Sequence, residues 1–133
     1  MRILVVDDQI YVRHTISLML KSTEFEVIEA GSGREALTKF EESKFDLAIV
    51  DIYMPGMDGV KIIKSLRKNT PNLPVIAISG RLLNRSELSA LDFFSLNPEL
   101  SNVICISKPF RPNQLIEAIH KAIGIDAVAA AAP

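Results

Sequence analysis

The stretch "VDIYMPGMDG", residues 50–59, ends an apolar run on a carboxylate, Asp51, and then turns through Pro55 and Gly56. The run before it, "DLAIV" (46–50), is nearly continuous in apolar residues, as is typical of a strand covered on both faces of a parallel sheet. Whether Asp51 has a function depends on which polar residues the fold brings beside it.

Apolar runs with the length of strands alternate along the chain with segments of helical periodicity. The predicted strands cover 2–6, 26–30, 46–50, 75–79 and 102–106. The predicted helices lie around 12–20, over 33–42, around 62–66, from 84 to 94 and from Pro112 to Gly124. Five strand–helix units in a row predict an α/β doubly wound parallel sheet, and we expect all strands but the second to be covered on both faces.

Length and composition indicate one globular domain. The 133 residues include 48% hydrophobic and 23% charged residues, and the net charge is −1. This balance gives no basic footprint for nucleic acid or for an anionic membrane. The single Cys105 excludes an intrachain disulfide and a cysteine-based zinc site. Acids follow too soon after the start for a signal peptide, and no stretch has the length of a membrane span, so we expect a soluble cytoplasmic protein.

Polar residues follow four of the five predicted strands. Asp7 and Asp8 follow the first strand, Asp51 ends the third, Ser79 ends the fourth and Lys108 follows the fifth. Ligands of open α/β sheets bind beyond the carboxyl ends of the strands, so we expect these five residues on one rim. The second strand contributes nothing comparable, as expected for a strand at the far edge.

This combination of residues suits phosphoryl transfer. Two carboxylates about 4 Å apart repel by roughly 4 kcal/mol at an effective dielectric of ~20, so three of them need a proton or a cation. Hard oxygen ligands suit Mg²⁺, which also binds phosphate oxygens, while a lysine and a serine can contact a phosphoryl group. A carboxylate can itself be the nucleophile and become an aspartyl phosphate.

The motifs that carry these residues, in this order and on these strand ends, resemble the receiver domains of two-component response regulators. They are "VVDDQ" (5–9), "VDIYMPGMDG" (50–59), "AISG" (77–80) and "ISKPF" (106–110). The resemblance covers 1–123 and implies a flavodoxin-like sheet of order 2-1-3-4-5, the arrangement for which receiver proteins are a standard example. Residues 124–133 are alanine-rich, and we expect them to form a tail or linker stub.

The resemblance also implies a role for each residue. Asp51 would accept a phosphoryl group from a histidine kinase or a histidine phosphotransfer protein. Asp8, Asp51 and the backbone carbonyl of Tyr53 would ligate Mg²⁺, and Asp7 would assist through water. Lys108, in a cis bond to Pro109, would pair with the phosphoryl oxygens. Ser79 would hydrogen-bond one of those oxygens, and its movement would switch the binding of a downstream effector protein at the face of the fourth helix and fifth strand.

Several positions depart from the family pattern. The 28 residues between Ser79 and Lys108 are more than the family usually has, and the extra length falls in "SLNPELSN" (95–102). Cys105 occupies the place of an aromatic residue that usually reports phosphorylation. We therefore hypothesise a remodelled output face. Tyr53 and Arg81 flank the path of hydrolytic water in this family, and a bulky Tyr53 would shield the phosphate.

Other functions are also compatible with parts of the pattern. A Mg²⁺-dependent phosphohydrolase of the haloacid dehalogenase type would need a second acid where Tyr53 stands. A pseudo-receiver would bind partners without phosphorylation, and a receiver cut from a longer regulator is a further alternative. "GSGREA" (31–36) matches a dinucleotide fingerprint, but it follows the second strand, and we interpret it as a strand-to-helix turn. We expect a signalling switch and not an enzyme.

Overall fold

The computed structural model describes residues 1–54, 57–79 and 100–124. The helix predicted over 84–94 lies outside these ranges, as do Arg81, most of the stretch 95–102 and the tail beyond Gly124.

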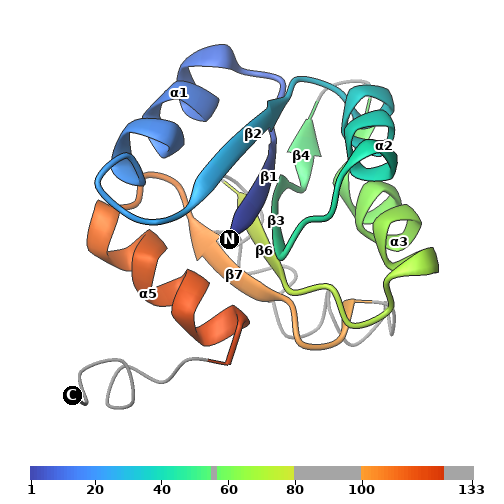
Figure 1. Ribbon diagram of the computed structural model, residues 1–133. Helices are drawn as coiled ribbons and strands as arrows, with labels where there is room; N and C mark the ends of the chain where they lie inside the picture. Colours follow the sequence, from blue (N-terminus) through green and yellow to red (C-terminus); the bar gives the residue numbers. More distant parts are fainter. Residues whose placement is uncertain (55–56, 80–99, 125–133) are drawn as a thin grey trace, which may run out of the picture.

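A five-stranded parallel sheet forms the centre of the molecule (Figure 1). Its strands are β1 (Arg2–Val6), β2 (Glu26–Ala30), β3 (Leu47–Asp51), β6 (Val75–Ser79) and β7 (Ile104–Ser107). They lie in the order β2-β1-β3-β6-β7. Because β6 and β7 are the fourth and fifth strands of this sheet along the chain, this is the predicted order 2-1-3-4-5. The prediction of a flavodoxin-like doubly wound sheet is therefore confirmed.

Two strands differ in detail from the sequence prediction. The strand predicted over 102–106 begins at Ile104, because Asn102 has a φ of 62°, outside the extended region, and Val103 closes a turn onto the Leu100 carbonyl. This strand, β7, is also partly exposed along its length, whereas β1, β3 and β6 are buried apart from Arg2. Its position at the end of the strand order, with β6 as its one ladder partner among the described strands, accounts for the difference.

The described helices cover both faces of the sheet. They are α1 (Ile10–Met19), α2 (Gly33–Glu42), α3 (Gly59–Asn69) and α5 (Pro112–Ala122). Helices α1 and α5 lie on one face, and α2 and α3 lie on the other (Figure 1). Alternate residues of each central strand face the two layers: Ile3 and Val5 pack with α1 and α5, while Leu4 and Val6 pack with α2 and α3. Two hydrophobic cores therefore hold the strand ends in fixed positions.

Short local structures connect the strands to the helices. Ser32 caps α2 by accepting a hydrogen bond from the Glu35 backbone amide, so "GSGREA" acts as the predicted strand-to-helix turn. After β3 the chain forms a two-stranded antiparallel ribbon, β4 (Tyr53–Met54) with β5 (Met57–Asp58), which the sequence did not predict. Asp58 then caps α3 through the Val60 amide.

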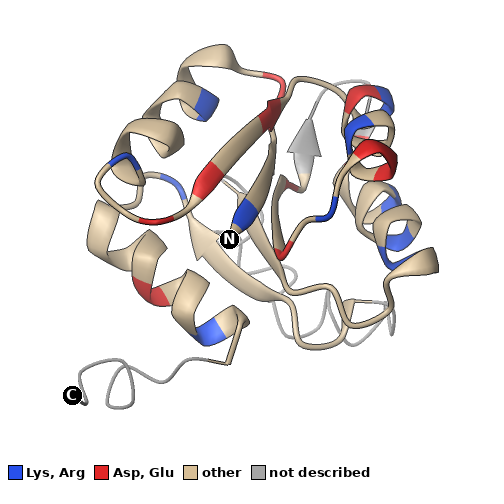
Figure 2. Cartoon of the chain, viewed as in Figure 1, with Lys and Arg blue, Asp and Glu red and all other residues tan. Residues whose placement is uncertain are grey.

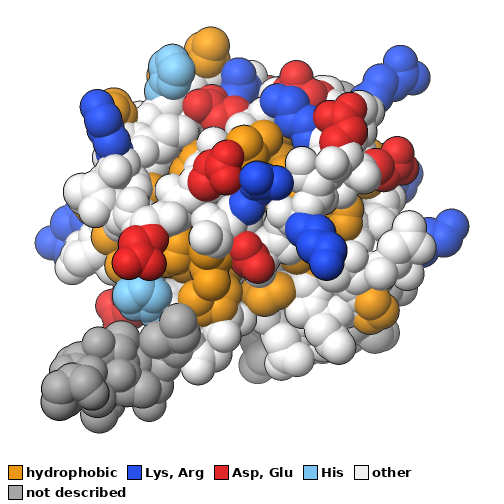
Figure 3. All heavy atoms as spheres, viewed as in Figure 1, with side chains coloured by type: hydrophobic (Ala, Val, Ile, Leu, Met, Phe, Trp, Pro, Cys, Tyr) orange, Lys and Arg blue, Asp and Glu red, His pale blue; other side chains and the backbone are white. Residues whose placement is uncertain are grey.

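Charged residues of both signs are distributed over the described surface. Acidic and basic side chains alternate over the visible face around patches of hydrophobic atoms (Figure 3), although α3 itself carries basic residues and no acidic one (Figure 2). Within the described ranges, none of the helices is long and apolar enough to cross a membrane.

Candidate functional site

The site residues are positioned by hydrogen bonds that continue the parallel ladder beyond the strand ends. The Asp7 amide donates to the Ala30 carbonyl (3.1 Å), the Ile52 amide to Ile78 (3.1 Å) and the Lys108 amide to Ser79 (3.0 Å). The starts of the segments that follow β1, β3 and β7 are therefore held at the carboxyl ends of the strands, beside the end of β6. This is the rim at which the sequence placed Asp7, Asp8, Asp51, Ser79 and Lys108.

Lys108 joins two acids of this rim. Its Nζ donates to Asp51 Oδ2 at 2.9 Å and to Asp7 Oδ2 at 3.1 Å. Asp51 is 3% exposed and Asp7 is completely buried. Asp7 Oδ1 also accepts a hydrogen bond from the Gln9 amide at 2.9 Å, so both oxygens of Asp7 have protein partners.

Burial and charge act against each other in this group. Burial raises the pKa of the Asp7 carboxyl above its usual value, and the Gln9 amide and Lys108 offset only part of this effect, while the charge of Asp51 adds to it. For Lys108, burial alone would lower the pKa, but hydrogen bonds and attraction to Asp51 and Asp7 outweigh burial and raise it. Lys108 is therefore a firmly held cation between two buried carboxylates.

The three acids form a group suited to a hard cation. One carboxylate oxygen from each of Asp7, Asp8 and Asp51 lies within 4.8 Å of the others, and Asp8 is exposed whereas its two neighbours are buried. An all-oxygen donor set with an open, solvent-facing member fits Mg²⁺, which keeps several waters of its own. The residues present at this edge therefore fit the metal that the sequence suggested.

Ser79 and Tyr53 lie at the same edge. Ser79 ends β6 and is completely buried; Asp51 pairs with Ile78 in the ladder, so Ser79 lies one residue further along the neighbouring strand. Tyr53 begins β4, two residues after Asp51, and its backbone pairs with Asp58. The Lys108–Pro109 bond is cis, which confirms the prediction from the family resemblance.

Three residues that support this edge, Arg13, Glu29 and Gly59, were not among the predicted site residues. Arg13 donates from Nη1 to the Asp7 backbone carbonyl at 2.7 Å and from Nε to Glu29 Oε1 at 3.1 Å. The second strand, from which no comparable residue was expected, thus supports the rim indirectly through Glu29. The backbone of Gly59 lies directly against Asp51 and Ile52. Gly59 and Glu29 are visible in the sequence, but the sequence does not indicate which residues they contact.

Cys105 occupies the position on β7 where the family resemblance leads us to expect an aromatic residue. It lies partly buried on β7 and packs against the core formed with α2 and α3. Burial raises the pKa of its thiol to about 12, so the reactive thiolate is scarce at neutral pH. Cys105 acts as a small apolar residue in this position.

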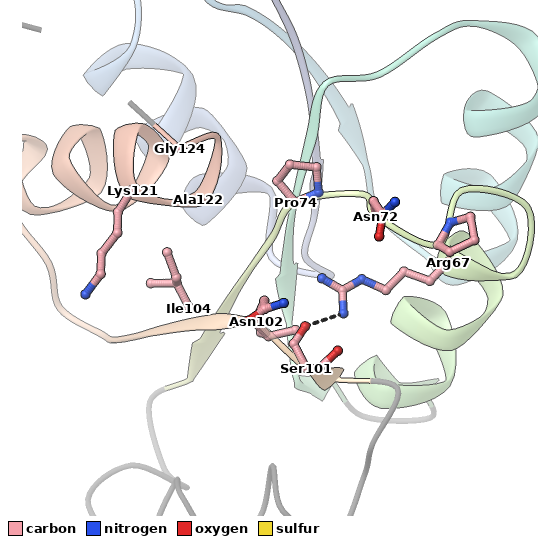
Figure 4. A pocket seen from close by; sticks show the side chains of 11 residues that line it. Arg67, Asn72, Pro74, Ser101, Asn102, Ile104, Lys121, Ala122 and Gly124 are labelled. Atoms are coloured by element: carbon pink, nitrogen blue, oxygen red, sulfur yellow. Dashed lines mark hydrogen bonds between the residues drawn. The ribbon is translucent and has the colours of Figure 1, made fainter. Parts of the chain in front are cut away.

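A hollow of about 510 Å³ lies at the opposite end of the strands from the rim. It is bordered by Arg67, Asn72, Pro74, Asn102 and Lys121 (Figure 4). The Arg67 guanidinium donates to the Ser101 carbonyl from Nη1 at 2.7 Å, the bond dashed in Figure 4, and to the Leu73 carbonyl from Nε and Nη2. Arg67 therefore fixes the end of the stretch 95–102 to the loop before β6. None of the acids or the lysine of the rim lines this hollow.

Comparison with known proteins agrees with the geometry of the rim. The family model described as the response regulator receiver domain matches residues 3–120. The chain belongs to this family. The chemotaxis protein CheY of Listeria monocytogenes is 33% identical to this receiver domain over 128 residues, covering 92% of this chain and 98% of CheY.

Solved structures of receiver proteins superpose on this one. CheY4 of Vibrio cholerae has a TM-score of 0.78 at 28% identity, covering 91% of this chain and 97% of CheY4. The response regulator TrrA of Thermotoga maritima, solved in complex with Mg²⁺-BeF, has a TM-score of 0.73 at 29% identity, with coverage of 91% and 97%. Receiver domains of two-component systems are signalling modules rather than classical enzymes. Membership of this family implies kinase and effector partners. The phosphohydrolase and pseudo-receiver alternatives are not favoured, since the rim keeps its three acids and its lysine.

Proposed function

We propose that Asp51 of this receiver domain accepts a phosphoryl group from the phosphohistidine of a histidine kinase or of a histidine phosphotransfer protein. The observation that carries the proposal is the pairing of the Asp51 carboxylate with Lys108 at 2.9 Å, beside the carboxylates of Asp7 and Asp8. A carboxylate at a strand end, next to a cation and a metal-compatible acid pair, has the neighbours that phosphoryl transfer requires.

Asp8, Asp51 and the Tyr53 carbonyl are the residues that would hold Mg²⁺, with Asp7 assisting through water. Both Asp7 oxygens already have protein partners, which supports an indirect role, whereas Asp8 faces solvent. The complex of the relative TrrA with Mg²⁺-BeF supports the choice of metal. When bound, Mg²⁺ neutralises negative charge on the phosphoryl oxygens.

The protein residues carry the transfer as follows. An oxygen of Asp51 attacks phosphorus, the bond between phosphorus and the donor's imidazole nitrogen breaks, and the imidazole leaves with the electron pair. Lys108, which is already beside Asp51, then pairs with a phosphoryl oxygen. The hydroxyl of Ser79 donates a hydrogen bond to another phosphoryl oxygen, and the movement of Ser79 towards the phosphate is the switch.

The output of this switch would be the binding of a downstream effector protein at the face of β7 and of the helix that the sequence predicts over 84–94. Cys105 lies on β7 where the family has an aromatic residue, and the stretch 95–102 precedes that strand, so we infer that this face is adapted to an unusual partner. Replacement of 95–102 by a short loop tests this inference. Unchanged affinity for every partner would contradict it.

Tyr53 shields the aspartyl phosphate from hydrolytic water in this proposal. The Tyr53→Ala variant should then lose its phosphate severalfold faster than the wild type. Loss at the wild-type rate, measured by intact mass after removal of the phosphodonor, would assign Tyr53 a packing role alone.

The proposal also includes the bounds of the domain, its location and the classes of molecule that it does not bind. The receiver domain spans 1–123 and is followed by a tail or linker stub over 124–133. It acts in the cytoplasm as a switch and not as an enzyme, and it binds neither nucleic acid nor membrane by itself.

Incubation with acetyl phosphate, with and without Mg²⁺, tests the function directly. We expect the intact mass to increase by one phosphoryl group only with Mg²⁺, and not at all in the Asp51→Asn variant. A folded wild type that gains no phosphoryl group would support a pseudo-receiver instead.

A further inference from the structure

The peptide group that joins Asp7 to Asp8 is held from outside the rim. The Asp7 carbonyl accepts a hydrogen bond from Arg13 Nη1 at 2.7 Å, and in the peptide group before it the Asp7 amide donates to the Ala30 carbonyl at 3.1 Å. A shift of the backbone at this peptide group would displace both carboxylates, because the Cα atoms of Asp7 and Asp8 are attached to its two ends. The contact from Arg13 therefore acts on a buried acid and on an exposed one together.

Arg13 is in turn fixed by β2. Its Nε donates to Glu29 Oε1 at 3.1 Å, and Glu29 Oε2 accepts a hydrogen bond from Ser17 Oγ at 3.1 Å. The Glu29 backbone carbonyl accepts a further bond from Lys39 Nζ. The guanidinium also lies against Gly31, where an added Cβ would stand 3.1 Å from Nη1. The side chains of Arg13 and Glu29 are 15% and 27% exposed, so solvent screens this pair only partly.

We propose that the Arg13–Glu29 pair positions the Asp7–Asp8 peptide for Mg²⁺ binding. Arg13 is a positioning residue and not a ligand, because its guanidinium contacts the carbonyl of Asp7 while Lys108 and the Gln9 amide contact the carboxylate. The fork of the guanidinium lets one side chain bind Glu29 and Asp7 at the same time, which the single ammonium of lysine does less well. This inference rests on the proposed Mg²⁺-dependent function.

A second arginine–glutamate pair, which joins β1 to β2, provides a matched control. Arg2 Nε donates to Glu26 Oε2 at 3.1 Å, the same distance as in the Arg13–Glu29 pair, and Arg2 pairs with Glu26 in the ladder of β1 and β2. That pair lies at the opposite ends of the strands, away from the acids. It therefore shares the chemistry of the Arg13–Glu29 pair without the contact to Asp7.

The test measures the Mg²⁺ dissociation constant by isothermal titration calorimetry of the full chain, in Arg13→Lys, Glu29→Gln, Arg2→Lys and Glu26→Gln. Loss of a group that orients metal ligands costs roughly 10- to 100-fold in affinity, and we expect a loss of that order in the Arg13 and Glu29 variants alone. With acetyl phosphate, the Mg²⁺ concentration at half-maximal rate should rise by the same factor. The rate at saturating Mg²⁺ should stay close to that of the wild type, because Asp51 and Lys108 are untouched.

Three outcomes would overturn the inference. Wild-type Mg²⁺ affinity in folded Arg13→Lys and Glu29→Gln would show that the pair only fastens α1 to β2. An equal loss in the Arg2 and Glu26 variants would show a general weakening of the β1–β2 pairing. A wild type that binds no Mg²⁺ would overturn the proposed function together with this inference, so the two failures are distinguishable.

Discussion

Lys108 and Asp51 are 57 residues apart in the chain and meet at 2.9 Å between Nζ and Oδ2. The same ammonium contacts Asp7 at 3.1 Å, so one cation balances two carboxylates that are both almost completely removed from solvent. The stability of the fold and the readiness of the acceptor therefore depend on the same charge.

Lys108→Met should destabilise the protein because it leaves two buried carboxylates without their cation. Removal of one partner from a fully buried ion pair costs about 3–5 kcal/mol, and since the Lys108 side chain is 23% exposed we expect a smaller loss, roughly 1–3 kcal/mol. Mg²⁺ should stabilise this variant more than the wild type, since it supplies the missing positive charge. Urea unfolding with and without Mg²⁺ measures both effects.

Lys21→Met is the matched control for that measurement, because Lys21 is exposed and lies away from the rim. An unfolding free energy of Lys108→Met equal to that of the control would contradict the balance of charges inferred for the rim.

Asp7→Asn should stabilise the protein at neutral pH. The pKa of Asp7 is raised on folding from its ordinary 3.8, mainly by burial, so the folded state binds this proton more tightly and the charged form costs stability. The stabilising contribution of the Asp7 proton is complete below pH 3.8 and is lost as the pH rises through the folded-state pKa. The advantage of Asp7→Asn should therefore grow as the pH rises through the folded-state pKa and vanish below about pH 3.8.

Chemical unfolding of Asp7→Asn and wild type across this pH range gives the difference directly. Glu24→Gln, at an exposed position, is the control variant for this comparison. A difference that grows as the pH falls would have the wrong sign for a buried carboxylate with a raised pKa.

The strand ends of this chain were predictable because each is marked locally. An apolar run followed by an acid, a serine or a lysine identifies the rim, and the parallel topology then brings Asp51 and Lys108 together whatever the helices do in detail. The sequence does not carry the left-handed backbone of Asn102 as a pattern, and so the start of β7 was predicted two residues too early. The ribbon of β4 and β5 was missed because strands of two residues show no periodicity.

The supporting contacts of the rim were not predictable for a different reason. The bond from Arg13 to the Asp7 carbonyl depends on the rotation of α1 about its axis and on its distance from β2. Hydrophobic periodicity shows which face of α1 is buried, but it does not say which backbone atom a polar side chain at the border of that face reaches. The same holds for Arg67, whose partners are carbonyls in two loops.

Arg67→Met should destabilise the fold and leave the rim intact. The variant removes donors to the Leu73 and Ser101 carbonyls, and carbonyls that lose their partners cost about 1–3 kcal/mol when solvent does not replace the donor. Burial lowers the pKa of Arg67, in agreement with a guanidinium that is partly withdrawn from water. Thermal unfolding and Mg²⁺-dependent phosphorylation should separate, with the first reduced and the second unchanged below the unfolding temperature.

Lys68→Met is the control for this variant, since Lys68 is the next residue of α3 and is exposed. Equal stability of the Arg67 and Lys68 variants would show that the bonds from Arg67 to the Leu73 and Ser101 carbonyls contribute nothing. A loss of phosphorylation in folded Arg67→Met would show that the hollow beside Arg67 is coupled to the rim.

Gly59→Ala tests whether helix propensity or the close packing against Asp51 and Ile52 decides the stability of the variant. Alanine is favoured over glycine within a helix by about 1 kcal/mol, so preference alone predicts a more stable protein. A Cβ at position 59 would lie 2.5 Å from the Asp51 carbonyl oxygen and 2.5 Å from Ile52 Cα, and both contacts are to backbone that has no side-chain freedom to move away. We therefore expect a net loss of roughly 1–3 kcal/mol, typical of overpacking, together with slower phosphorylation because relief of the clash displaces Asp51. Denaturant unfolding and the rate of mass gain with acetyl phosphate check the two parts. A variant more stable than the wild type and phosphorylated at the same rate would show that α3 begins without pressing on the acceptor strand.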